Sequence, residues 1–248
     1  MIGQTISHYN IIEKLGEGDC LHPTSKKRNS KTKFLLIVVL SIVFHWSCKK
    51  DNVPVQPNST EIVTYAGTTY HTVQIGSQCW LKENLNVGTM IRGTDTAKNN
   101  KEIEKYCYDN DTINCNIYGG LYQWNEAMQY DTTPGTRGIC PPGWHIPTLL
   151  DYETLRTTVG RDGNALKAIG QGTGGGAGTN TSGFSALFAG SRDILGFFGY
   201  VRLQTRFWSS TEYDSTSADH LGLVYDVGGI ALYAYSEDMG FSVRCIKD

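Results

Sequence analysis

The chain has 248 residues, enough for one substantial globular domain in addition to a leader segment. Its formal net charge is −2, and residues 49–248 carry more Asp and Glu than Lys and Arg. Because no surplus of basic residues is left to bind phosphates, we expect no nucleic-acid partner. The 28 Gly, 14 Tyr and 5 Trp residues favour a loop-rich domain with strands over a helical bundle.

The first 18 residues, Met1–Gly18, resemble the opening strand and Gly-rich loop of a bacterial serine/threonine protein kinase. The resemblance then ends, because Leu21 stands where the third glycine of the loop should be. The other kinase motifs, which position ATP, metal and substrate, do not occur in the sequence. We therefore interpret residues 1–25 as a non-functional kinase-like remnant, or as the result of a start site assigned too far upstream.

A lipoprotein signal peptide is predicted over residues 26–48. Five basic residues precede the apolar run Phe34–Trp46, and a small residue and Cys48 follow it. This order is typical of an exported bacterial lipoprotein, and the run is too short to span a bilayer. We expect cleavage before Cys48 and a lipid on its thiol, although His45 and Trp46 differ from the usual cleavage box.

This signal predicts a protein of the cell envelope, at the outer membrane or cell surface of a Gram-negative bacterium, held to the membrane by the lipid. Residues 49–60 are polar and contain two prolines, which is typical of an extended tether. The folded domain is expected over residues 61–248. It begins with two β-rich runs, Glu61–Tyr65 and Thr69–Ile75, separated by Ala-Gly-Thr, a pattern that predicts a hairpin.

Two short helices are predicted in the middle of the domain. Leu121–Tyr130 has apolar residues at helical spacing. Leu149–Val159 follows Thr148, a natural N-cap, and carries Asp151 in its first turn. The Gly-rich segment 170–183 lacks the Lys-Ser/Thr of a phosphate-binding loop, and we interpret it as a flexible surface loop.

The C-terminal third is predicted to be strands and glycine turns. Leu221–Val227 and Ile230–Tyr235 flank Gly228 and Gly229, which predicts a hairpin with a two-residue turn at the glycines. Residues 240–246 are expected to form a closing strand.

Five cysteines follow the predicted lipid-attachment site, and in an exported chain they favour disulfides over metal ligands. Cys107 and Cys115 bracket a turn-rich loop that a disulfide could close. Cys140 and Cys245 are the next plausible pair and would tie the middle of the domain to its last strand. Cys79 is then either buried and free or a competitor for one of these partners, and the sequence alone does not fix the pairing.

Several motifs in unbroken order resemble the Fibrobacter succinogenes major paralogous domain, a family of exported bacterial domains often carried on lipoproteins. The resemblance spans about residues 61–248. It implies an α+β domain of C-type-lectin-like fold, with two short helices, a small twisted antiparallel sheet and long loops. It implies no established activity, so function must be argued from a site. The motifs are Val73–Leu85, Tyr118–Trp124, Cys140–Pro147, Gly183–Leu187, Phe207–Glu212 and Gly240–Cys245.

No catalytic constellation is expected. His71, His145 and His220 are scattered, and neither a Ser-His-Asp order nor a nucleophile elbow occurs. The related sulfatase-modifying proteins use two cysteines near the C-terminus, whereas only Cys245 stands there in this chain. We therefore expect a non-enzymatic protein, with an enzyme related to formylglycine-generating proteins and a purely structural envelope protein as alternatives.

Calcium is considered because a lectin-like fold can hold it in the long loop. Asp109, Asp111 and Asn114 supply oxygen ligands, but the spacing of an EF-hand fails. We expect no cofactor, with calcium at these three residues as the alternative.

For ligand binding, the best candidates are Tyr213, Tyr233 and Tyr235, because Tyr suits both the apolar faces of sugars and the hot spots of protein interfaces. The four tryptophans of the domain are expected in the core: Trp80, Trp124, Trp144 and Trp208. The sequence therefore predicts a lipid-anchored binding or adhesion module for glycans or proteins.

Overall fold

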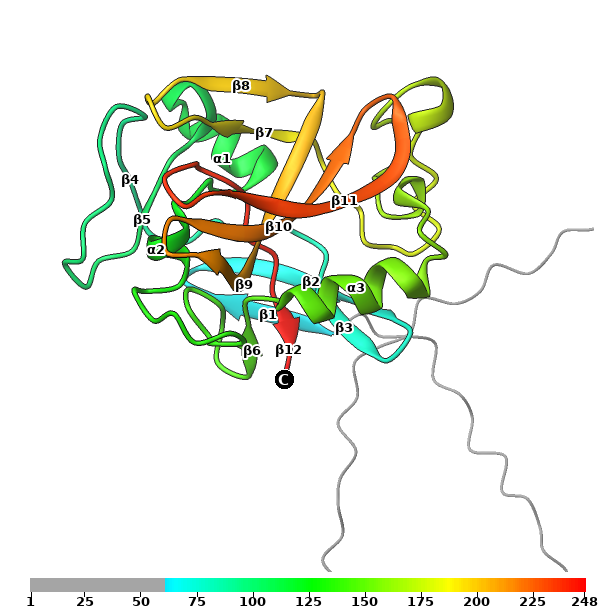
Figure 1. Cartoon of the computed structure of the whole chain (residues 1–248), viewed down its shortest axis with the longest axis horizontal. Coiled ribbons are helices and arrows are strands. Elements are labelled where there is room, and N and C mark those ends of the chain that lie inside the picture. Colours follow the sequence, from blue (N-terminus) through cyan, green and yellow to red (C-terminus); the bar gives the residue numbers. More distant parts are fainter. Residues whose placement is uncertain (1–60) are drawn as a thin grey trace, which may run out of the picture.

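A computed structural model describes residues 61–248, which form a β-rich structure with three α-helices (Figure 1). The predicted kinase-like remnant, signal peptide, lipid-attachment residue Cys48 and tether all fall within residues 1–60, outside the described residues. The described part has both helices and sheets, as an α+β domain should, but it is richer in strands than the single small sheet that we predicted.

Two five-stranded sheets dominate the described residues. In the first sheet every pairing is antiparallel. In the second sheet β7 runs parallel to β9, and the other pairings are antiparallel. The first has the strand order β1 (Ile62–Tyr65), β2 (Thr68–Ile75), β3 (Gln78–Leu81), β12 (Ile246–Lys247) and β6 (Trp144–His145). The second has the order β11 (Val227–Ser236), β10 (Ser217–Val224), β9 (Gln204–Asp214), β7 (Ala189–Arg192) and β8 (Phe198–Val201). A small parallel pair is formed by β4 (Thr89–Met90) and β5 (Glu104–Lys105).

The hairpin predicted at the start of the domain is present as β1 and β2. Its turn is Ala66-Gly67, and both residues have positive φ, 48° and 77°. A two-residue turn with two positive φ values matches the twist of the flanking strands, so the register of this hairpin is set locally.

The helices differ from the prediction in number and length. The second predicted helix is α3 (Leu149–Thr158), closed at its start by a capping box between Thr148 and Asp151. The first shrinks to α2 (Trp124–Ala127), because Leu121 and Tyr122 form β-bridges instead of a helical turn.

Helix α1 (Thr112–Tyr118) was not predicted, and Asp111 caps it by accepting a hydrogen bond from the backbone N–H of Ile113. Ile113 and Ile117 are 62 % and 52 % exposed. Because these apolar residues do not face the core, α1 leaves no amphipathic pattern in the sequence. Three 3₁₀ turns complete the helical elements: η1 (Tyr108–Asn110), η2 (Gly163–Ala165) and η3 (Gly174–Gly176).

The last hairpin turns three residues earlier than predicted. Val224 pairs directly with Val227, so the turn is at Tyr225-Asp226 and Gly228 and Gly229 lie inside β11. Close packing at this hairpin depends mainly on Gly163 of η2, where a Cβ would lie 2.5 Å from the carbonyl oxygen of Gly229. A Cβ at Gly228 would lie 3.1 Å from the Asn164 side chain of η2, whereas one at Gly229 would make only ordinary contacts.

The Gly-rich segment 170–183 is held against this turn, in contrast to the flexible loop predicted. The buried Lys167 ammonium donates to the carbonyl oxygens of Gly176 and Val227. A Cβ at Gly176 would lie 2.4 Å from the carbonyl oxygen of Tyr225. The glycines therefore allow the backbone of the segment to approach the hairpin.

The C-terminal segment joins the two sheets. Only Ile246–Lys247 forms a strand, shorter than the one predicted over residues 240–246. Gly240–Ser242 instead form single bridges to β7, to β9 and to the segment before α2. Since its backbone partners lie in both sheets, this segment fixes the sheets relative to each other.

The core lies between the sheets and α3. One apolar cluster combines β2 and β3 with α3, β9 and β10. The second contains the disulfide Cys140–Cys245 and the side chains of Phe241 and Val243. All four tryptophans expected in the core are buried: Trp80, Trp124, Trp144 and Trp208. Within the described residues, no helix is both long enough and apolar enough to cross a membrane.

Candidate functional site

The candidate site lies at the face of the second sheet opposite the one that packs on α3. Side chains along a strand alternate between the two faces of its sheet. On the inner face, Phe207 of β9 and Leu232 of β11 flank Leu221 of β10 and pack in the core. On the opposite face, the residues in register are Trp208, His220 and Tyr233. Trp208 and His220 are fully buried there, and Tyr233 is exposed. The sheet therefore places a row of rings on the side away from α3.

These rings belong to a larger ring cluster, which we define as Trp208, His220, Tyr233, Tyr235 and Phe241. The His220 ring centre lies 4.4 Å from that of Tyr233, 5.2 Å from that of Phe241 and 5.7 Å from that of Tyr235. Such separations are those of favourable edge-to-face ring contacts. Tyr233 and Tyr235 are 42 % and 38 % exposed, so they form the solvent side of the cluster.

His220 is a neutral ring in the dry part of the cluster. It is fully buried, and neither ring nitrogen has a hydrogen-bond partner among the described residues. Burial, together with the nearby charge of Arg206, lowers the pKa of His220 to about 3. A histidine with so low a pKa is a poor general base at neutral pH, because it holds a proton weakly.

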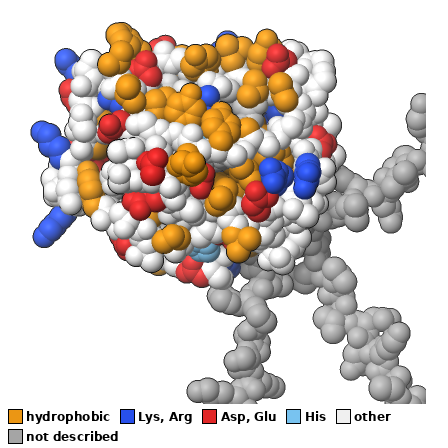
Figure 2. Space-filling view, viewed as in Figure 1, with side chains coloured by type: hydrophobic (Ala, Val, Ile, Leu, Met, Phe, Trp, Pro, Cys, Tyr) orange, Lys and Arg blue, Asp and Glu red, His pale blue; other side chains and the backbone are white. Residues whose placement is uncertain are grey.

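An aromatic groove of about 440 Å³ adjoins the ring cluster. We define the aromatic groove by the residues Asp193, Phe197, Phe198, Tyr200, Arg206 and Tyr235, which line it together with Met239. Phe197 and Tyr200 are 68 % and 61 % exposed. Figure 2 shows hydrophobic side chains gathered over the part of the molecule where Figure 1 places β8 and β11. Exposed apolar side chains gathered in this way are typical of binding surfaces.

The polar groups of the aromatic groove come from Arg206 and Asp193. The Arg206 guanidinium lies 5.1 Å from the ring centre of Tyr235 and 5.4 Å from that of Phe241. Stacking on rings holds a guanidinium in place while leaving its N–H donors available. The Asp193 carboxylate accepts hydrogen bonds from the backbone N–H groups of Leu195 and Phe197, which fixes the turn before β8.

Two disulfides join cysteines within the described residues. They join Cys107 to Cys115 and Cys140 to Cys245, the two pairs that the sequence favoured. Cys79 is buried and is not a free thiol, so that alternative is wrong.

The family model of the Fibrobacter succinogenes major domain matches residues 73–247, which is more than half of the chain. The chain belongs to this family. The matched residues include both disulfides, the ring cluster and the aromatic groove of this Fibrobacter succinogenes major domain. No curated protein and no solved structure matched the chain.

The Fibrobacter succinogenes major domain brings together two of the three predicted ligand-binding tyrosines. Tyr233 and Tyr235 are neighbours in the ring cluster, with ring centres 5.9 Å apart. Tyr213 lies near the end of β9, is 71 % exposed and does not belong to the cluster. Sequence reasoning missed Phe197, Tyr200 and Arg206, and the available signal was the apolar run around Gly196, which would be unusual for a surface turn.

The residues considered for calcium have local structural roles in this Fibrobacter succinogenes major domain. Asp111 caps α1, and the Asn114 side-chain amide donates to the carbonyl oxygen of Tyr108. Asp109 adopts a left-handed conformation, with φ of 55°, in η1. Over residues 61–248, no group of three or more His, Cys, Asp or Glu side chains is arranged to hold a metal.

The two remaining histidines are paired with carboxylates. His71 Nδ1 lies 2.8 Å from a Glu83 oxygen at the surface. His145 Nδ1 lies 2.8 Å from Asp248, and its Nε2 lies 3.5 Å from Asp151 of the α3 capping box. Burial alone would lower the pKa of His145, but the hydrogen bonds and charges of the two carboxylates outweigh it and raise the pKa. His145 therefore links the C-terminal residue to the start of α3.

Proposed function

We propose that this member of the Fibrobacter succinogenes major domain family is a non-enzymatic binding module that takes glycans in the aromatic groove. We further propose that the chain is a lipid-anchored protein of the cell envelope, with the lipid on Cys48, and that the domain has C-type-lectin-like architecture. The observation that carries the proposal is the gathering of exposed aromatic rings around one stacked arginine.

The chemistry of the aromatic groove suits a sugar. Sugar rings have apolar C–H faces that stack on aromatic side chains, and hydroxyl groups that need hydrogen-bond donors and acceptors. Tyr200 and Tyr235 supply rings with a polar tip, and Arg206 supplies a fork of N–H donors. A volume of about 440 Å³ lies within the range of ligand pockets.

A glycan array probed with the full-length chain, purified in detergent, tests the binding role. We expect binding to at least one glycan class, with affinity falling tenfold or more in Tyr235→Ala. The matched control is Tyr213→Ala, which removes an exposed tyrosine outside the ring cluster and should bind like the wild type. Equal binding by both variants would move the site elsewhere, and an absence of glycan binding combined with capture of a protein would favour a protein ligand.

The array also tests the cofactor expectation. Binding should be the same with added calcium and with a chelator, because we propose that no cofactor is needed. A requirement for calcium would revive the alternative site at Asp109, Asp111 and Asn114.

The enzyme alternative would need a reactive cysteine near the C-terminus. Cys245 is fully buried and bonded to Cys140, and a disulfide sulfur is not the thiolate that acts as a nucleophile. This observation supports a binding module over an enzyme related to formylglycine-generating proteins. Alkylation of Cys245 in the native, non-reduced protein would contradict it.

The membrane partner is tested separately by mass spectrometry of the mature protein from bacterial membranes. We expect a lipid-modified N-terminal peptide beginning at Cys48 and release of Cys48→Ala from the membrane fraction. A mature chain that begins elsewhere and carries no lipid would refute the anchor without affecting the glycan site.

A further inference from the structure

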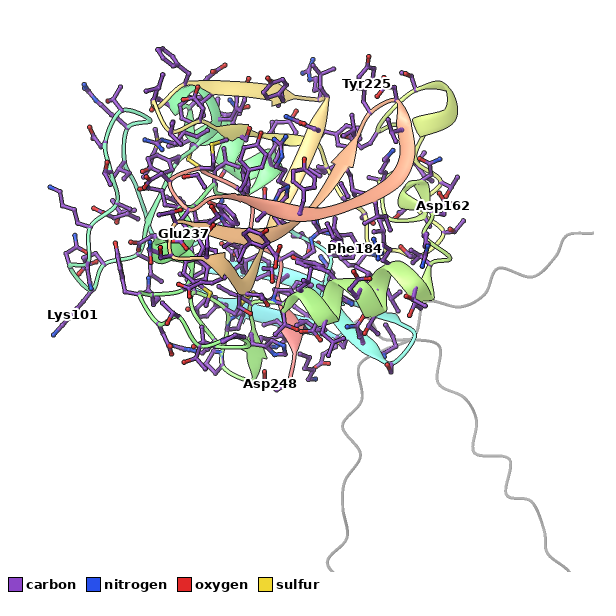
Figure 3. The ribbon with its side chains drawn as sticks, viewed as in Figure 1. Lys101, Asp162, Phe184, Tyr225, Glu237 and Asp248 are labelled. Atoms are coloured by element: carbon purple, nitrogen blue, oxygen red, sulfur yellow. A yellow bond between two sulfur atoms is a disulfide. The ribbon has the colours of Figure 1, made fainter. Side chains whose placement is uncertain are left out.

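A second, smaller pocket of about 110 Å³ lies between α2 and the turn that follows β11. We define the acidic pocket by Asn125, Glu126, Tyr130, Glu237 and Asp238, which are among the residues that line it. Figure 3 labels Glu237, whose backbone carbonyl accepts a hydrogen bond from the N–H of Trp124 at the start of α2. This bond holds the two sides of the pocket together.

Glu237 is buried and incompletely satisfied. It is only 8 % exposed, and its Oε2 accepts a hydrogen bond of 2.9 Å from the Asn125 side-chain amide. Its Oε1 is buried and has no hydrogen-bond partner. Buried polar atoms are nearly always paired in folded proteins, so this oxygen points to a missing donor.

Glu126 is a second buried carboxylate in the same pocket. It is 1 % exposed, and its oxygens accept from the Tyr130 hydroxyl, from the Gln129 side chain and from the backbone N–H of Glu104. Burial raises the pKa of both Glu126 and Glu237 above the usual value.

No cation of the described residues pairs with either carboxylate, and Glu237 has only one hydrogen-bond donor, whereas Glu126 has three. Neither Glu126 nor Glu237 forms an ion pair within residues 61–248. Buried carboxylates are costly unless a cation or several donors pair with them. The backbone at the pocket is also unusual, because Gln129 and Tyr130 are consecutive non-Gly residues with φ of 53° and 61°. Unfavourable backbone conformations of this kind cluster at ligand sites.

We propose that the acidic pocket binds a primary ammonium group. An ammonium carries three N–H donors on one positive charge. It would meet side-chain oxygens of Asn125 and Asp238 in the pocket, and the buried Glu237 carboxylate would turn its unpaired Oε1 toward the bound charge. The volume of about 110 Å³ is several times the roughly 30 Å³ that one water takes in the liquid, which suits the end of an alkylamine or lysine side chain.

An ammonium fits this pocket better than a metal ion. Calcium takes six to eight oxygen ligands, whereas no three metal-ligating side chains converge anywhere in residues 61–248. The pocket is also separate from the aromatic groove, since the two share no lining residue. The two proposals can therefore fail independently.

The test is an amide NMR titration of the full-length chain, purified in detergent. The probes are methylammonium chloride and Nα-acetyl-lysine amide, with the lysine derivative acetylated at Nε as the neutral control. We expect saturable shifts of the Asn125 side-chain amide with both charged probes and none with the neutral one. Saturation by methylammonium alone would support a small free amine as the ligand rather than a lysine side chain.

Glu237→Gln removes the charge but keeps the shape, and should weaken binding at least tenfold. Asp238→Asn, at an exposed residue of the same pocket, provides a second variant if Glu237→Gln does not fold. The matched control is Asp162→Asn, an exposed carboxylate that does not line the pocket and lies far from Glu237 in Figure 3, and it should bind like the wild type. An absence of saturable shifts, equal binding by the pocket variants and the wild type, or tighter binding of calcium chloride than of methylammonium would each overturn the proposal.

Discussion

Removal of the Cys140–Cys245 disulfide should destabilise the protein far more than removal of the Cys107–Cys115 disulfide. The two bonds close loops of very different length, with sequence separations of 105 and 8 residues. A disulfide stabilises mainly by restricting the unfolded chain, and the restriction grows with the length of the closed loop.

The chain-entropy relation gives the expected sizes. Removing the disulfide of the longer loop should lower the free energy of unfolding by about 4.8 kcal/mol at 25 °C, and removing that of the shorter loop should lower it by about 2.5 kcal/mol. The difference, about 2.3 kcal/mol, depends only on the ratio of the loop lengths. Since folded domains are stable by about 5–15 kcal/mol, the loss of Cys140–Cys245 alone removes a large share of the total.

The assay is urea unfolding of two double variants, Cys140→Ala/Cys245→Ala and Cys107→Ala/Cys115→Ala, each compared with the wild type. All four cysteines are buried, so each variant also loses similar packing and the comparison isolates the loops. We expect a clearly lower midpoint for the first variant. Equal losses, or a larger loss for the short loop, would refute the argument from loop length.

Three further changes test the packing and capping described above. Thr148→Ala should lower the free energy of unfolding by about 1 kcal/mol through loss of the α3 capping box. The control, Thr157→Ala, changes an exposed residue of the same helix and should have little effect. Equal urea midpoints for the two variants would show that the cap does not stabilise the fold. Gly163→Ala places a Cβ against the backbone of β11 and should cost about 2 kcal/mol, whereas Gly175→Ala meets open space, so equal thermal midpoints would contradict the close approach. Because the pKa of His145 is raised in the folded state, its pairing with the two carboxylates stabilises the fold fully below about pH 6.5. This stabilisation is lost as the pH rises through the raised pKa. His145→Gln should therefore destabilise the protein more at pH 5.5 than at pH 8.5 by urea unfolding, and a pH-independent difference would argue against the pairing with carboxylates.

Patterns of a few neighbouring residues correctly predicted one hairpin and one helix. The β1–β2 hairpin follows from Ala66-Gly67, and α3 follows from Thr148 and Asp151. Helix α1 escaped prediction because its apolar residues face solvent. The turn of the last hairpin was misplaced because Gly228 and Gly229 lie inside β11, where the backbone of Gly229 approaches Gly163 of η2, and not in the turn.

Only part of the candidate site could be predicted from the sequence. Tyr233 and Tyr235 stand two apart in a strand, so their shared face was predictable. The groove opposite them contains Phe197 and Tyr200, from a hairpin more than thirty residues earlier in the chain. Nothing local indicates that this hairpin lies beside Tyr235.

The sequence by itself determined the family and the four tryptophans of the core, and it favoured the two cysteine pairs that form disulfides, because these depend on residue type and on motifs of neighbouring residues. Only the tertiary structure decided that His220 lies dry beneath two tyrosines and that Glu126 and Glu237 share one pocket. Those arrangements depend on strand register and on contacts between residues about a hundred positions apart. Such contacts are set by the packing of the whole domain, which short-range patterns do not encode.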